Sequence, residues 1–189
     1  NYLAAHLIHY HLHDHSTVYS MAREILADAR GSRMRKIELA TMQLQSAALI
    51  GLKRSDAIQT SPANPDPVQS VLARIAVLAE SLGFGFEQAQ ALYVSGAEYA
   101  HGGFYIKALG QFQLAVGIAD SLGDEELATG IRESIVLIHS IQGNAQASSE
   151  VLQEIEAQLV EDGGGDKLAL NLLAQGRLLI RSYQYAPAL

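Results

Sequence analysis

The sequence contains no cysteine, no tryptophan and only four prolines in 189 residues. Without cysteine there is no disulfide framework, no zinc ribbon and no thiol nucleophile. Basic residues are few, with 13 Lys and Arg against 20 Asp and Glu, so the formal net charge is −7. A protein that neutralises a phosphate backbone needs a basic surface, so nucleic acid is not expected as a partner. The one basic cluster is interpreted as a solvated helix end and consists of Arg30, Arg33, Arg35 and Lys36.

Long apolar runs are missing as well. No run approaches the roughly 20 residues that a membrane span needs, so no membrane association is expected. We expect a cytoplasmic protein, and the lack of cysteine fits the periplasm equally well. Hydrophobic residues nevertheless make up 49% of the chain and charged residues 17%, which is typical of a globular domain with a real core.

Apolar residues recur at helical spacing in almost every segment, and the alternating pattern of strands is missing. We expect Ser32, Asp66 and Asp124 to be the N-caps of three of the helices, with Pro67 in the first turn after Asp66. The predicted helices, about nine in all, lie near 2–13, 16–30, 33–52, 67–82, 87–101, 105–121, 125–142, 145–161 and 167–182.

A repeat with a constant interval is the most informative pattern in the chain. The segment Ala79-Glu80-Ser81-Leu82-Gly83 recurs as Ala119-Asp120-Ser121-Leu122-Gly123, and Gly163 follows after the same interval. Gly103 and Gly143 are separated by that interval too, each in a turn between two predicted helices. Self-similarity of this kind is the signature of stacked helix pairs, so we predict a helix-pair solenoid.

The segment 89–123 carries a series of small and aromatic residues at fixed spacings: Leu92, Gly96, Tyr99, Gly103, Tyr105, Ala108, Phe112 and Ala115. This series resembles the tetratricopeptide repeat family. The resemblance implies an all-α fold, a right-handed superhelix of antiparallel helix pairs. It also implies that Gly96 and Ala108 lie where the two helices of a pair approach most closely, and that Gly103 permits a tight turn.

The resemblance weakens away from this segment. The next unit has Val136 and Ser148 where a small residue and an alanine are expected. The last unit stops shortly after Tyr185, so we expect a truncated repeat and a chain that is part of a longer protein. The expected organisation is one continuous solenoid, with motif-poor helix hairpins over 1–66 and repeats of about 40 residues over 67–189.

A histidine cluster lies near the N-terminus. On a helix, His6, His9 and His13 fall within an arc of about 60°. A pair such as His9 and His13, one turn apart, can chelate zinc, so a metal site is one interpretation of the cluster. The preferred interpretation is a polar, partly neutral helix face that meets a partner or a preceding part of a longer protein. No glutamate follows these histidines as in HExxH, and neither a nucleophile elbow nor a phosphate loop is present, so we expect no cofactor and no enzyme activity.

The resemblance further implies a binding groove, because in this family the first helix of each pair lines the concave surface. Carried over by spacing, the groove residues are Tyr93, Val94, Ala97, His101, Glu133, Leu137, Ile141, Leu173, Arg177 and Arg181. Arg177 and Arg181 are one turn apart and either bind a carboxylate or belong to the solvated surface. The other groove residues are mostly apolar, which favours an apolar or helical partner segment.

Two functions are consistent with such a groove. The first is a non-catalytic scaffold that binds a protein or peptide. The alternative is a sensory or regulatory input domain of a larger, bacterial signalling or transcription-regulating protein, which responds to a small molecule or a peptide. Both would use the same groove, and the sequence does not separate them.

Overall fold

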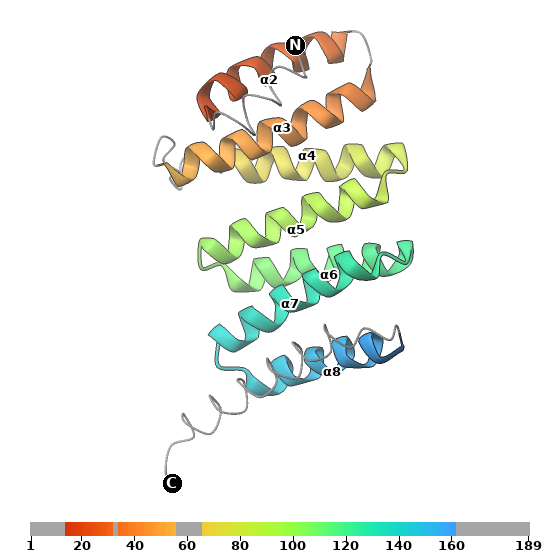
Figure 1. Cartoon of the computed structure of the whole chain (residues 1–189). Helices are drawn as coiled ribbons and strands as arrows, with labels where there is room; N and C mark the ends of the chain where they lie inside the picture. The colour runs from red at the N-terminus through yellow and green to blue at the C-terminus, as the bar shows by residue number, and fades with distance from the viewer. Residues whose placement is uncertain (1–13, 32–33, 56–65, 162–189) are drawn as a thin grey trace. The chain divides into compact units, whose positions relative to one another are not determined.

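A computed structural model of the chain describes residues 14–31, 34–55 and 66–161 (Figure 1). Within these ranges the chain forms seven helices and no strands, so the all-α prediction is confirmed there. The helices are α2 (His15–Gly31), α3 (Arg35–Arg54), α4 (Pro67–Leu82), α5 (Gly85–His101), α6 (Tyr105–Leu122), α7 (Glu125–Ile141) and α8 (Ala145–Glu161). The other two predicted helices, 2–13 and 167–182, lie outside the described residues.

The chain divides into two compact units, an N-terminal unit (Asn1–Ser95) and a C-terminal unit (Gly96–Leu189). The division falls inside α5. The boundary after residue 66 marks where the repeat motifs are expected to begin, and it stays a prediction. Within each unit, consecutive helices run in opposite directions (Figure 1). No helix in the described part of the chain is long and apolar enough to cross a membrane.

Two of the three predicted N-caps are confirmed. The Asp66 carboxylate accepts the N–H of Val68 at 3.0 Å, ahead of Pro67 in the first turn of α4. The Asp124 carboxylate accepts the N–H of Leu127 at 3.0 Å and starts α7 in the same way. Such bonds satisfy N–H groups that the first turn of a helix leaves without a partner.

The prediction that Ser32 caps the next helix is wrong. Helix α3 begins at Arg35, and its N-cap is Met34, which makes no side-chain capping bond. The Met34 N–H donates to the carbonyl of Ala29 near the end of α2 at 2.9 Å. The next helix therefore starts later than the serine suggested.

Four turns in the described residues share one backbone geometry and follow one another at a constant interval. Each has a glycine in the left-handed region, with φ between 69° and 77°, at Gly83, Gly103, Gly123 and Gly143. In each turn the residue after the glycine donates its N–H to the carbonyl five positions earlier, at 2.9–3.0 Å. This is the bonding of a Schellman motif, which glycine adopts without a Cβ penalty. The repeat seen in the sequence therefore consists of two helix–turn steps of equal length.

The core of the N-terminal unit joins four helices. Leu26 of α2, Met42 of α3, Ile75 of α4 and Ala91 of α5 belong to one buried apolar cluster. Two hydrogen bonds also join α4 to α5. The Ser95 hydroxyl donates to Oε1 of Gln69 at 2.6 Å, and Nε2 of Gln69 donates to the Ser95 carbonyl at 3.2 Å. Burial of apolar surface from every helix stabilises the unit.

The basic cluster of the sequence is partly used inside the N-terminal unit. Nε of Arg30 donates to one oxygen of the buried Glu38 at 2.9 Å, and Nη1 of Arg35 donates to the other at 3.2 Å. Lys36 lies 5.5 Å from the centre of the Phe84 ring, in a cation–π contact. The cluster is therefore more than a solvated helix end, because a buried carboxylate needs such partners.

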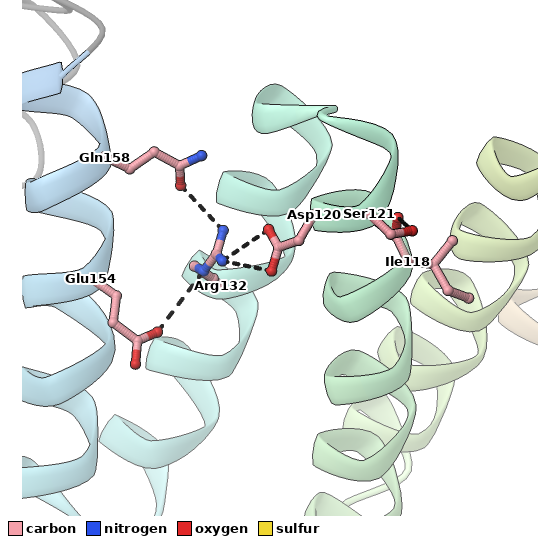
Figure 2. Close-up of polar contacts among 6 residues, drawn as sticks. All are labelled: Ile118, Asp120, Ser121, Arg132, Glu154 and Gln158. Atoms are coloured by element: carbon pink, nitrogen blue, oxygen red, sulfur yellow. Dashed lines mark hydrogen bonds and ion pairs between the residues drawn. The ribbon is translucent and has the colours of Figure 1, made fainter.

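In the C-terminal unit, buried Phe112 and Ala115 of α6, Ile131 of α7 and Ile155 of α8 provide much of the core. Arg132 of α7 connects three helices of this unit at one place (Figure 2). Its Nη2 donates to both carboxylate oxygens of Asp120 on α6 at 2.9 Å. Its Nη1 donates to Gln158 on α8 at 3.2 Å, and its Nε lies 3.9 Å from the Glu154 carboxylate. A guanidinium suits this position because its donors point in several directions at once.

Candidate functional site

The C-terminal unit contains an open hollow of about 280 Å³ between α5, α6 and α7. The nine lining residues are Ala97, Ala100, His101, Tyr105, Phe112, Ser134, Leu137, Ile138 and Ile141. Most of this surface is apolar, and we call it the α5–α7 hollow. A concave apolar surface with a few polar groups is the usual form of a binding site.

The shape of the hollow follows from the sizes of its side chains. Phe112 and Ile138 are each only 2% exposed, so they belong to the core at the base of the hollow. The α5 side of the hollow has only small side chains at Ala97 and Ala100, which leaves space above them. On the α7 side, Leu137 and Ile141 stand one helical turn apart and are 59% and 55% exposed. The two side chains are neighbours on one helix face and together form an exposed apolar surface beside the hollow.

The polar groups of the hollow are few. His101, at the end of α5, is exposed, and Tyr105, at the start of α6, is half-buried. The Ser134 hydroxyl donates to the Gly130 carbonyl at 3.2 Å, inside α7. Lys107 is not among the lining residues and lies 5.5 Å from the ring centres of Tyr99 and Phe104. No acidic side chain is among the described residues that line the hollow.

Four of the ten predicted groove residues line this hollow together: Ala97, His101, Leu137 and Ile141. Glu133 is exposed on α7 and is not part of the lining. Tyr93 and Val94 lie on the part of α5 that belongs to the N-terminal unit, where Val94 packs against the core cluster. The remaining three, Leu173, Arg177 and Arg181, lie outside the described residues.

Five lining residues were not predicted as groove residues: Ala100, Tyr105, Phe112, Ser134 and Ile138. The sequence pattern marks Tyr105 and Phe112 only as repeat-motif residues. Ser134 and Ile138 are one turn apart, and Ile141 follows Ile138 at the next helical spacing. Ser134 and Ile138 directly follow the predicted Glu133 and Leu137, so a groove face one residue wider on α7 would have included them, whereas the contribution of α6 depends on how the three helices pack.

The metal interpretation is not tested by the structure. His6, His9 and His13 lie outside the described residues. In the ranges that are described, no group of three or more His, Cys, Asp or Glu side chains could hold a metal ion.

Comparison with known proteins adds no assignment. No family model matches the chain, and no curated protein sequence matches it either. The described residues form antiparallel helices only, and the C-terminal unit contains the apolar α5–α7 hollow. Membership of the tetratricopeptide family stays a prediction based on residues 89–123.

Proposed function

We propose that this protein is a non-catalytic binding module that takes an apolar, helical segment of another protein in the α5–α7 hollow. The observation that carries the proposal is the exposed pair Leu137 and Ile141 beside a hollow with small side chains opposite. A helical segment places apolar residues at i, i+3 and i+4, and such residues can enter a hollow of this kind together.

The size and chemistry of the hollow support a peptide. Its volume of about 280 Å³ lies just below the range for small-molecule sites, which is roughly 300–1,000 Å³. Such a space accommodates a few side chains of a longer segment. No acidic side chain is among the described residues that line the hollow, and its mostly apolar wall fits the apolar face of a helical partner segment.

The proposal includes the finer architecture that the repeat implies. Four turns of the same geometry at a constant interval support a regular stack of tetratricopeptide-like helix pairs. We propose that the stack is a right-handed superhelix. Small-angle scattering of the whole chain is the direct test, because two units in a continuous superhelix give one fixed, elongated profile, whereas freely jointed units do not.

A peptide selection tests the binding function. A phage library of random peptides, each long enough for four helical turns, is selected on the immobilised full chain. The affinity of each enriched peptide is then measured for the wild type and for a Leu137→Ser, Ile141→Ser variant. We expect enriched peptides with apolar residues at i and i+3 or i+4, and we expect the double substitution to weaken them by about thirtyfold, or roughly 2 kcal/mol.

The matched control is Leu114→Ser on α6. Leu114 is a leucine with almost the same exposure as Leu137, 58% against 59%, but it is not among the residues that line the hollow. It should leave peptide binding unchanged. Enriched peptides that bind the double variant and the wild type equally well would show that the hollow is not the site.

A further inference from the structure

A second cavity, in the N-terminal unit, has a different chemistry. It lies between α3 and α4, has a volume of about 630 Å³, and is called the α3–α4 cavity below. Its lining consists of Arg35, Glu38, Met42, Ala73, Arg74, Val77, Leu78, Ser81 and Leu82. This volume is well within the range of small-molecule sites.

The spacing of residues on α4 explains why the cavity exists. Ala73, Val77 and Ser81 follow one another at one-turn intervals, and the two outer side chains are short. Next to them, the parallel row of Arg74, Leu78 and Leu82 gives the lining one cationic and two apolar side chains. Val77 is 66% exposed although it lines the cavity, so an apolar wall there has no cover in the described part of the chain.

The charges at the cavity favour an anion. Glu38 is buried, and each of its carboxylate oxygens already accepts a hydrogen bond from an arginine, Arg30 or Arg35. Its negative charge is therefore compensated within the protein. Arg35 uses one of its five donors for Glu38, and its side chain is 63% exposed. Arg74 is exposed and adds a second guanidinium to the lining.

We propose that the α3–α4 cavity binds a small amphipathic carboxylate, with its apolar body against Val77, Leu78 and Leu82 and its carboxylate at Arg74. Guanidinium groups bind carboxylates through paired hydrogen bonds, and the apolar wall binds the rest of the molecule by excluding water. The α5–α7 hollow has no arginine in its lining, so the two sites select for different ligands. This inference is independent of the proposed peptide binding.

Titration calorimetry of the full chain with octanoate and with 1-octanol tests the proposal, because the two probes share an apolar body and differ in charge. We expect octanoate to bind about tenfold more tightly than octanol, in line with the strength of hydrogen bonds to charged groups. Arg74→Gln should weaken octanoate binding by about tenfold and leave octanol binding unchanged. Val77→Asp should abolish octanoate binding, because it places a negative charge at an exposed position of the same cavity.

Two control variants separate this site from others. Arg23→Gln removes an exposed arginine of α2 that is not in the cavity lining, and Leu137→Ser changes the α5–α7 hollow. Both should bind octanoate like the wild type. Circular dichroism melts of each variant confirm that it is folded. Equal affinity for octanoate and octanol, no octanoate binding at millimolar concentration, or wild-type affinity in Arg74→Gln would each overturn the proposal.

Discussion

The ring of Phe112 lies directly against the backbone of Gly96. A Cβ atom placed on Gly96 would be 2.5 Å from Cε1 of that ring and 3.2 Å from the carbonyl oxygen of Ala108. The ring is almost completely buried and has little room to move. Gly96 is therefore required by the close approach of α5 and α6, as the repeat pattern predicted, and not by an unusual φ angle.

We expect Gly96→Ala to destabilise the protein. The added methyl group overpacks the helix contact, which typically costs about 1–3 kcal/mol, and the gain in helix propensity offsets only part of this. The melting temperature should fall by about 2–8 °C, measured by circular dichroism. The loss should be smaller in a Phe112→Leu background, where the shorter side chain leaves space. A Gly96→Ala variant as stable as the wild type would contradict the close approach.

Gly117→Ala should have the opposite effect. Gly117 is exposed within α6, and a Cβ atom there would meet nothing within 4 Å. Alanine is favoured over glycine inside a helix by about 1 kcal/mol, partly because the unfolded chain loses conformational freedom. We expect a melting temperature higher by about 2–4 °C. Since the chemical change is the same as at Gly96, the pair separates packing from helix propensity, and a lower melting temperature would place Gly117 in a contact.

Arg132→Met should loosen the C-terminal unit. Methionine keeps an apolar stem but removes the donors to Asp120, Glu154 and Gln158 (Figure 2). The Arg132 side chain is only 16% exposed, so we expect a loss of about 1–2 kcal/mol in the free energy of unfolding by urea. The loss should shrink in about 1 M salt, because the Asp120 and Glu154 carboxylates are largely exposed. Arg23→Met, on the surface of α2, serves as the control and should change stability little.

Asp14 should make the start of α2 sensitive to acid. Hydrogen bonds from Thr17, its side chain first and then its backbone N–H, lower the pKa of Asp14 below its usual value of 3.8, and the Ser16 hydroxyl adds to this. Because the pKa is lowered in the folded state, the stabilisation is complete above 3.8 and is lost as the pH falls through the folded-state pKa. The melting temperature of Asp14→Ala should therefore be lower than that of the wild type near about pH 6, and this difference should disappear in strong acid. A gap that is independent of pH would exclude a charge effect.

The repeat was predictable from the sequence where it depends on local backbone geometry. It was less predictable where the chain has other residue types than the family pattern. Val136 and Ser148 depart from the family pattern, yet the Ser148 hydroxyl is fully buried and donates to the Val136 carbonyl at 3.2 Å. It also bonds to the hydroxyl of Ser140 at 3.0 Å. Val136 and Ser148, one repeat after Gly96 and Ala108, are therefore again in contact. The contact is a hydrogen bond from a side chain to the backbone, which the family pattern does not predict.

The sequence by itself determined the helices and the turns between them. Helix spacing, the carboxylate caps at Asp66 and Asp124, and the regularly spaced glycines act within a few residues of the chain, so local chemistry is enough to position them. Only the tertiary structure decided which side chains meet in a site. The α5–α7 hollow combines small residues of α5, a core ring of α6 and exposed apolar residues of α7, and the α3–α4 cavity places Arg35 and Arg74 in one lining. Such combinations depend on how each helix is rotated about its axis and how closely it packs on its neighbours, which is fixed by contacts between residues far apart in the chain.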